Sequence, residues 1–320
     1  MRGCRGRRGR AGGVALLGTL ALLALAPAPR RGGERVVPLG VVDGDGLRVR
    51  RAGREEALRL ACVDCEESLH TSDRAPRDKP QTVLGERARL WLVARLANVG
   101  ELTLEAHPDE PRDGFGRLLA HARLPDGRDL GLELVRAGLS PYFTKYGTCP
   151  LADRAYARAE REARAARRGI WAPDANCPRT PDAPIARRDY DALRAWWTLR
   201  ADAIAGYRAR AARDPLGTAR ADRPAELARA ADGRTLVFVE LVRARQRDGA
   251  LELTCAGDLL TLEVPAAARP HFADLDLERR HWSGRANHLW LRARPVRDGD
   301  GWRAVCREPG DLVEAVLKGS

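Results

Sequence analysis

The stretch L-R-L-A-C-V-D-C-E-E, residues 58–67, decides the fold of the first half of the chain. Just before it comes V-V-D-G-D-G-L-R-V, residues 41–49. Both stretches read as strands, and the short turn at Ala52-Gly53 joins them. We therefore expect a hairpin that brings the acidic residues of the two stretches close together.

The two stretches carry a set of residues suited to one chemistry. Asp45 and Asp64 can hold a metal ion, and Glu67 can act on a water molecule. Arg59 can bind a phosphate group. A separate stretch, F-G-R at residues 115–117, ends in a second arginine, Arg117. Such a combination is typical of metal-assisted cleavage of phosphodiesters.

The same residues resemble the motifs of the staphylococcal nuclease-like (thermonuclease) family. Five motifs follow in the family's order: D-G-D at 43–45, R-L-A-C-V-D-C-E-E at 59–67, F-G-R at 115–117, G-L-S at 138–140 and G-I-W at 169–171. The resemblance implies a five-stranded OB-type barrel with packed helices that binds one calcium ion and cuts DNA and RNA.

Carried over by position, the family's metal ligands fall on three residues. The resemblance implies that the carboxylates of Asp45 and Asp64 bind Ca²⁺, with the backbone carbonyl of Cys65 as a third ligand. Oxygen ligands of this kind suit calcium and leave coordination sites for water and phosphate.

The resemblance also implies the catalytic roles. Glu67 would position or deprotonate the attacking water, and Arg59 and Arg117 would hold the phosphate, because the guanidinium fork matches two phosphate oxygens. Asp113 and Tyr142 would contact the substrate.

The chain departs from the family at Cys65-Glu66, where the usual pair is Thr-Pro. A main-chain ligand tolerates the change to Cys65, but the loss of proline frees the backbone before Glu67. Glu66 adds a negative charge beside the site, which either tightens metal binding or disturbs the pKa of Glu67. A disulfide at Cys65 would make the loop rigid by another route.

The first 30 residues resemble an export signal. Basic residues precede the apolar run 14–26, which is short for a membrane span and suits the core of a signal peptide. Ala24-Leu25-Ala26 has the form of a cleavage site, but Pro27 is unfavourable there. We expect an exported protein, secreted or periplasmic, that is anchored to the membrane through residues 14–26 if the signal stays uncleaved.

The cysteine count agrees with an oxidising compartment. Beyond Cys4, six cysteines remain, an even number that predicts disulfides. A Cys255–Cys306 pair is one option, and the pairing of the others stays open. We do not expect Cys62-x-x-Cys65 to form a redox or zinc motif, because residues three apart on a strand point to opposite faces.

The pattern of the whole chain indicates two globular domains. We expect a nuclease-like domain at 36–178, a helical linker region at 179–234 and an OB-like accessory domain at 235–320. The expected helices are 85–96, 130–137, 151–168 and 187–213. The expected strands of the second domain are 235–243, 250–255, 259–264, 288–294 and 302–306, with a helix between 270 and 282.

The last long strand of the second domain offers a weaker prediction. Trp290, Arg292 and Arg294 alternate onto one face, which suits the stacking of bases and binding of phosphates in single-stranded nucleic acid. An ordinary polar outer face of a barrel is the simpler explanation of the pattern, and we favour it. The D-G-D-G at 298–301 repeats the letters of the first motif between two strands and reads only as a turn.

The net charge of the chain is +12, and five of these charges come from arginines in the first ten residues. A positive remainder suits a polyanionic partner. The leading hypothesis is an exported Ca²⁺-dependent endonuclease that acts on DNA or RNA without a small-molecule cofactor and leaves 3′-phosphates. Two alternatives stay open: a non-catalytic nucleic-acid-binding protein built on two OB-type barrels, and an envelope-tethered protein that binds protein or glycan through its C-terminal half.

Overall fold

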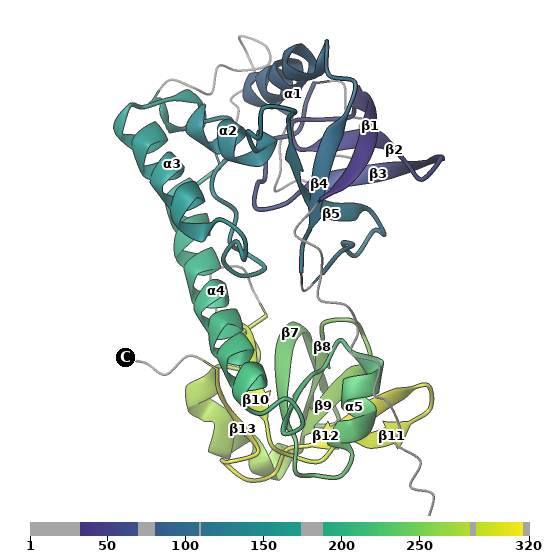
Figure 1. Ribbon diagram of the computed structural model, residues 1–320. Helices are drawn as coiled ribbons and strands as arrows, with labels where there is room; N and C mark the ends of the chain where they lie inside the picture. Colours follow the sequence, from purple (N-terminus) through teal and green to yellow (C-terminus); the bar gives the residue numbers. More distant parts are fainter. Residues whose placement is uncertain (1–32, 70–80, 109, 174–187, 282–285, 316–320) are drawn as a thin grey trace, which may run out of the picture.

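The hairpin expected at the acidic stretches begins a closed β-barrel. We describe the protein from a computed structural model, which covers residues 33–69, 81–108, 110–173, 188–281 and 286–315. The chain forms two β-rich domains, and one long helix runs along the side of the molecule from the first domain to the second (Figure 1).

Among the residues that the structure describes, the first domain contains five strands, three α-helices and a short 3₁₀ helix. Their bounds are β1 Glu34–Val41, β2 Gly46–Arg51, β3 Arg54–Leu60, α1 Val83–Leu96, β4 Leu102–Ala106, β5 Leu118–Arg123, α2 Leu130–Arg136, α3 Asp153–Ala165 and η1 Gly169–Trp171.

The five strands close into a barrel in the order β1-β2-β3-β5-β4. All the pairs are antiparallel except β3 with β5, which is parallel. Alternate residues of the strands fill the interior, among them Leu47, Val49, Leu58 and Leu60, which are all fully buried. This confirms the OB-type barrel expected from the motifs.

Two helices of the first domain, α1 and α2, begin at side-chain caps. The hydroxyl of Thr82 accepts a hydrogen bond from Gly85 N at 3.1 Å, and the carboxylate of Asp129 accepts one from Leu132 N at 3.2 Å. Each cap satisfies a backbone donor that the first turn of a helix leaves without a partner. The predicted helices 85–96, 130–137 and 151–168 are confirmed as α1, α2 and α3.

The connecting helix α4, Tyr190–Arg213, confirms the helix expected at 187–213 and packs on both domains. On the first domain, Trp197 meets the ring of Phe143 edge-on at 4.9 Å. On the second, Tyr207 stacks on Phe238 at 5.0 Å. The helix therefore links the two cores through aromatic contacts, while the domain boundaries themselves stay a prediction.

The second domain contains the remaining elements. Their bounds are β6 Thr218–Arg220, α5 Pro224–Ala230, β7 Leu236–Arg247, β8 Ala250–Cys255, β9 Leu260–Val264, η2 Ala266–Leu275, β10 His288–Leu291, β11 Val296–Asp298, β12 Gly301–Val305 and β13 Leu312–Glu314.

The strand pairing in the second domain follows that of the first barrel, except that the pair of strands that would close the barrel is missing among the described residues. Strands β7, β8 and β9 are antiparallel neighbours, β12 joins β9 in parallel and β10 joins β7. Among the described residues β10 pairs onward with β13 and β12 with β11, so the two ends do not meet. The domain is β-rich and follows the OB strand order, but its sheet is open.

Some expected elements of the second domain differ in the structure. The helix expected at 270–282 is the 3₁₀ helix η2, and Pro270 within it has no N–H to donate to a longer α-helix. Strand β6 and helix α5 lie in a polar stretch where we expected neither. The turn expected at 298–301 is confirmed, because it joins β11 to β12.

The strand expected at 288–294 ends early, at Leu291. The half-buried ring of Trp290 lies 5.1 Å from that of Phe238 and 6.3 Å from that of Tyr207. Tyr207 belongs to α4, so the helix covers the face that we expected to be open to nucleic acid. Trp290 is therefore only partly exposed, and its use in binding nucleic acid stays a prediction.

The cysteine predictions also need correction. The five described cysteines, Cys62, Cys65, Cys149, Cys255 and Cys306, are all free thiols. The suggested Cys255–Cys306 disulfide is absent, and both thiols fill the core of the second domain. Cys177 and the apolar segment 14–26 lie outside the described residues. Within the part that the structure describes, no helix combines the length and apolarity needed to cross a membrane.

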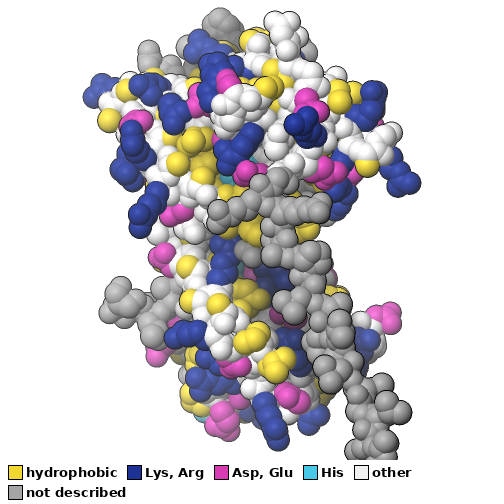
Figure 2. All heavy atoms as spheres, viewed as in Figure 1, with side chains coloured by type: hydrophobic (Ala, Val, Ile, Leu, Met, Phe, Trp, Pro, Cys, Tyr) yellow, Lys and Arg dark blue, Asp and Glu magenta, His cyan; other side chains and the backbone are white. Residues whose placement is uncertain are grey.

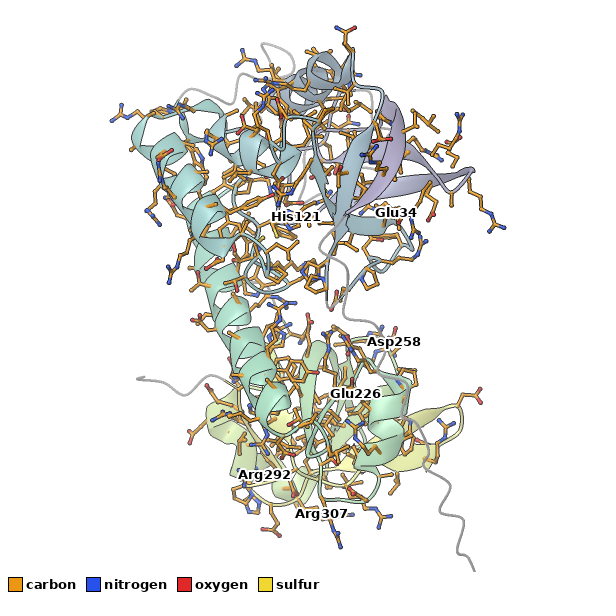
Figure 3. All side chains as sticks on the ribbon, in the orientation of Figure 1. Glu34, His121, Glu226, Asp258, Arg292 and Arg307 are labelled. Carbon is orange, nitrogen blue, oxygen red and sulfur yellow. The ribbon has the colours of Figure 1, made fainter. Side chains whose placement is uncertain are left out.

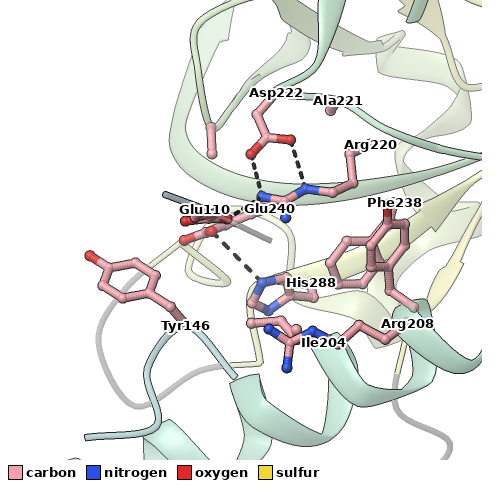
Figure 4. Close-up of a pocket in the computed structure, with 12 residues that line it drawn as sticks. Glu110, Tyr146, Ile204, Arg208, Arg220, Ala221, Asp222, Phe238, Glu240 and His288 are labelled. Carbon is pink, nitrogen blue, oxygen red and sulfur yellow. Dashed lines mark hydrogen bonds and ion pairs between the residues drawn. The ribbon is translucent and has the colours of Figure 1, made fainter. Parts of the chain in front are cut away.

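The two domains meet at a small polar cavity of about 40 Å³ between α4, β6 and the loop at Glu110 (Figure 4). Arg220 of the second domain binds Glu110 of the first at 3.1 Å, and it also pairs with Asp222. On the same wall His288 lies 3.7 Å from Glu240. Ion-paired side chains from both domains line this cavity, so it is part of the contact between the domains.

Candidate active site

Asp45 lies in the tight loop between β1 and β2, and its side chain is 1% exposed. Asp43 fixes the loop by accepting a hydrogen bond from Asp45 N at 3.0 Å. The glycine between them is required by packing, since a Cβ on Gly44 would lie 2.7 Å from the Cβ atoms of Cys65 and Ala88. The D-G-D sequence thus presses the loop onto α1 and onto the second acidic stretch.

Arg59, the next-to-last residue of β3, joins the two acidic stretches. One end of its guanidinium contacts Asp45 and the other donates to Asp64 Oδ1 at 3.0 Å. It also donates to the carbonyl oxygen of Val63 at 3.1 Å. The structure therefore brings Asp45, Asp64 and Arg59 together, as the sequence predicted.

The charges at this point are strongly coupled. Burial of Arg59 favours its neutral form, but the carboxylates of Asp45 and Asp64 outweigh this and raise the pKa of the guanidinium. Arg59 thus remains charged and offsets two buried carboxylates.

Asp64 has a second arginine partner that the sequence did not suggest. Arg188, just before α4, donates to Asp64 Oδ2 at 3.0 Å, and its side chain is almost fully buried. Burial opposes its charge, but Asp64 raises the pKa of Arg188 above its usual value. No signal in the sequence links these positions, because 124 residues separate them.

The substituted pair Cys65-Glu66 is well anchored. Cys65 N donates to Asp45 Oδ2 at 2.7 Å, so its main chain lies beside that carboxylate. Glu66 accepts hydrogen bonds from Tyr190, at 2.8 Å, and from Thr82. Glu66 is therefore engaged with α4 and the cap of α1, and these two bonds fix the loop without a proline or a disulfide.

Glu67 follows on the same loop, three residues after Asp64, and its side chain is half-buried. Its carbonyl oxygen accepts a hydrogen bond from Thr82 N at 3.1 Å. A Cβ on Gly85 would lie 2.1 Å from this oxygen, so α1 can approach the loop only with glycine there. The backbone of the expected general base is thus held by the first turn of α1.

Arg117 lies just before β5, on the same barrel face as Arg59. The register places Arg59 opposite Leu119, and alternation puts Arg117 on the face of Leu119. Asp113 holds the Arg117 side chain through Nε at 2.7 Å, and the ring of Phe115, which is 89% exposed, covers the guanidinium. Asp113 therefore orients Arg117, and Arg117 does not contact the buried carboxylates.

Tyr142 does not line an open site. It is 3% exposed, and its hydroxyl donates to Asp153 at 2.6 Å and accepts from Cys149 N at 2.6 Å. Burial, followed by the hydrogen bond to Asp153, raises the pKa of this phenol. These contacts argue against the expected role of Tyr142 in substrate binding and make it part of the core.

The residues predicted in the second domain are not brought to this site. Arg292 lies past the end of β10, in the part of the second domain away from the first (Figure 3). Arg294 donates to the carbonyl of Ala231 within its own domain. Their use in substrate binding therefore stays a prediction separate from the carboxylate site.

The carboxylate site fits a hard divalent cation. Asp45 and Asp64 are both buried and both reach one guanidinium, so their oxygens converge on a small region. The main chain of Cys65 lies beside them. A donor set made only of oxygens suits calcium or magnesium better than a soft metal.

The surface around both domains is mixed in charge. On the face that Figure 2 shows, lysine and arginine side chains are spread over both domains, with carboxylates between them. The positive charge therefore forms no single continuous patch on this face, and the arginines of the site itself are the local means of binding an anion.

Comparison with known proteins shows what the first domain is similar to. Residues 57–173 match the family model described as "Staphylococcal nuclease homologue". The chain is 29% identical over 157 residues to "Endonuclease YhcR" of Bacillus subtilis (strain 168), a match of 48% of this chain but 13% of that protein. It is 25% identical over 131 residues to an "Uncharacterized endonuclease" of Escherichia coli O157:H7, which covers 41% of this chain and 72% of that protein. With the closed barrel, these matches show that the first domain of this chain is a staphylococcal nuclease-like domain of OB type.

Proposed function

We propose that this chain is a metal-dependent endonuclease that hydrolyses phosphodiester bonds of DNA or RNA. The observation that supports it most is the convergence of Asp45, Asp64 and Arg59 in a staphylococcal nuclease-like domain. Glu67 follows on the same loop and Arg117 on the same barrel face. These five residues supply each group that hydrolysis of a phosphodiester requires.

The proposed metal is Ca²⁺, held by the carboxylates of Asp45 and Asp64 and by the carbonyl oxygen of Cys65. A divalent cation there would withdraw charge from a phosphate oxygen and make a nearby water more acidic. Both carboxylates are buried and lie together, so a divalent cation there would share with Arg59 and Arg188 the compensation of their charge.

The protein's own residues would perform the remaining steps. Glu67 would accept the proton of the attacking water. Arg59 and Arg117 would each donate to phosphate oxygens and so stabilise the charge that grows in the transition state. Arg59 already carries two carboxylate contacts, so substrate binding requires it to share its donors between them and the phosphate.

We also propose the finer properties expected from the resemblance: attack that breaks the bond to the 5′ oxygen, products with 3′-phosphates, and export directed by residues 14–26. The apolar run behind an arginine-rich start supports export. N-terminal sequencing of the protein recovered from the medium or periplasm tests it, and an intact Met1 in the cytoplasmic fraction would contradict it.

The activity is tested with single-stranded DNA, the purified chain, and either Ca²⁺ or EGTA. We expect digestion only with Ca²⁺, and a loss of about 10²–10⁴-fold in Glu67→Gln, the range for removal of a general base. Glu101→Gln is the matched control, because Glu101 is an exposed partner of Arg35 on the same barrel.

Product analysis completes the experiment. Fragments whose 5′ ends accept a phosphate label from a kinase without prior phosphatase treatment carry free 5′-hydroxyls. This result would support cleavage of the bond to the 5′ oxygen. Binding of DNA without digestion in any divalent metal would instead favour the alternative, a nucleic-acid-binding protein that uses its barrel without catalysis.

A further inference from the structure

A second group of potential metal ligands lies behind the carboxylate site. Cys62 is in the turn after β3, His121 is in β5 and Cys149 is in the loop before α3. Their ligand atoms all lie within 4.8 Å of one another. His121 Nε2 is 3.5 Å from Cys149 Sγ and 3.9 Å from Cys62 Sγ. Figure 3 shows His121 in the interior of the first domain, between the barrel and α3.

These distances match a tetrahedral zinc site. With Zn–S near 2.3 Å and Zn–N near 2.0 Å, tetrahedral geometry places the sulfur and nitrogen ligands about 3.5 Å apart. The His121–Cys149 separation of 3.5 Å equals this value, and the His121–Cys62 separation of 3.9 Å is slightly longer. Three ligands from separate parts of the fold thus point to one centre without any rearrangement of the backbone.

The far side of the histidine ring has the partner that a metal-binding histidine needs. His121 Nδ1 lies 2.9 Å from Asp129 Oδ2, and both side chains are buried. Tyr156 donates to the other oxygen of Asp129 at 3.0 Å and so fixes the carboxylate. A carboxylate on Nδ1 holds the proton there and directs the lone pair of Nε2 toward the thiols.

The backbone at Cys62 is held in an unusual conformation. Its φ of +63° lies in the left-handed region, which disfavours residues other than glycine. Phe143 N donates to the carbonyl of Cys62 at 3.0 Å, and Ala61 N donates to Ala120 at 2.9 Å, so neighbouring segments maintain the turn. Such strain persists where the surroundings fix it, and it is concentrated at functional positions.

We infer that Cys62, His121 and Cys149 form a zinc site, with Asp129 orienting the histidine and one coordination position left for water or another ligand. Two thiolates and an imidazole are soft ligands, so the site selects zinc rather than the hard cation proposed for Asp45 and Asp64. The ion would connect the turn after β3 to β5 and to the loop before α3. Because Asp64 is two residues after Cys62, this connection would also stabilise the loop that carries Asp64.

The sequence did not suggest this site, because it offers Cys62 and Cys65 as the apparent pair. Cys65 Sγ instead donates to the carbonyl of Gly44 at 3.2 Å, away from the cluster. The true partners lie 59 and 87 residues further along the chain, and the parallel pairing of β3 with β5 brings His121 beside Cys62.

The test is a titration of the reduced, metal-free full chain with Co²⁺, followed by displacement with Zn²⁺. We expect one equivalent of Co²⁺ to give the thiolate-to-cobalt charge-transfer band and the strong visible bands of a tetrahedral complex, and one equivalent of Zn²⁺ to remove them. Calcium at Asp45 and Asp64 gives neither band, so the result is independent of nuclease activity. Absence of both bands in the folded wild-type protein would overturn the site.

Variants assign the signal to these residues. Cys149→Ser is expected to lose the charge-transfer band or to weaken Co²⁺ binding at least tenfold, while Cys306→Ser, a buried thiol of the second domain, keeps the wild-type spectrum. An unchanged spectrum in Cys149→Ser would overturn the inference. A Cys62–Cys149 disulfide in peptides from the natively purified, unreduced protein would overturn it as well, since disulfide sulfurs cannot supply two thiolates.

Discussion

At the scale of single residues, the candidate site depends on how Arg59 compensates Asp45 and Asp64. The guanidinium is only 12% exposed, and it contacts both buried carboxylates. Removal of one partner from a buried ion pair costs about 3–5 kcal/mol, because the other charge stays buried without compensation. The same two carboxylates are the proposed metal ligands, so metal and arginine share the task of offsetting them.

We therefore predict that Arg59→Ala lowers the free energy of unfolding by about 3 kcal/mol in EGTA. Calcium is expected to restore part of this loss, because it takes over the compensation of Asp45 and Asp64. Thermal or urea unfolding with and without Ca²⁺ checks it. Arg48→Ala is the control, since Arg48 pairs with Glu55 on the barrel surface. Equal stabilisation of wild type and Arg59→Ala by calcium would contradict the shared role.

At this scale, the sequence predicted the site residues that lie in local motifs. It did not predict the residues that tertiary contacts bring to the site. Asp45 directly precedes β2, Arg59 lies in β3 and Asp64 follows the end of β3, so their approach follows from the β2–β3 hairpin. Arg188 and Tyr190 reach the same loop from α4, and the identity of residues so distant in sequence cannot be derived from spacing. The burial of a tyrosine in the core, as at Tyr142, depends likewise on the packing of several elements.

At the scale of elements, α4 is the most informative part of the fold. It packs Trp197 on the first domain and Tyr207 on the second. Its start also delivers Arg188 to Asp64 and Tyr190 to Glu66. The α-helices α1 to α4 were predicted within a few residues of their bounds, whereas short strands such as β6 and β13 have too few residues to show a pattern.

The contact of Arg188 with Asp64 Oδ2 competes with a metal for the same oxygen. We predict that Arg188→Ala tightens Ca²⁺ binding roughly tenfold, the equivalent of about 1.4 kcal/mol. Calorimetric titration with Ca²⁺ checks it. Arg194→Ala is the matched control on the same helix, because Arg194 pairs with Glu160 instead. Unchanged or weaker calcium binding in Arg188→Ala would show that the arginine does not compete.

At the scale of the whole molecule, ion pairs connect α4 and the first domain to the second. Arg200 of α4 is 1% exposed; it binds Glu240 of β7 at 2.7 Å and the side chain of Asn287 at 2.9 Å. Burial disfavours the charge on Glu240, but Arg200 and then His288 outweigh it and lower the pKa of Glu240 below its usual value. The sequence predicted two domains and their β-rich character, but it could not predict these contacts or the open seam of the second sheet.

Because the folded state lowers the pKa of Glu240, the direction in which stability changes with pH follows. Glu240 contributes stability at pH values above the usual glutamate pKa of 4.5 and loses it as the pH falls through the lower folded-state pKa. We predict that Glu240→Gln lowers the free energy of unfolding by about 3 kcal/mol at pH 7, and that the difference from wild type shrinks as the pH falls below 4.5. Urea unfolding across this range checks it, with the exposed Glu101→Gln as control. A difference that stays constant with pH would rule out the charge of Glu240 as its source.

The central claim is that Asp45 and Asp64 hold the metal with which the first domain cuts nucleic acid. The most direct measurement is the rate of cleavage of a single-stranded oligonucleotide as free Ca²⁺ is raised from an EGTA-buffered zero, in wild type and in Asp45→Asn. We predict no cleavage without the metal, saturation in the wild type, and a half-maximal Ca²⁺ concentration at least tenfold higher in Asp45→Asn, or no cleavage at all. Cleavage that is equal in EGTA and calcium, or a calcium dependence unchanged by Asp45→Asn, would contradict the claim.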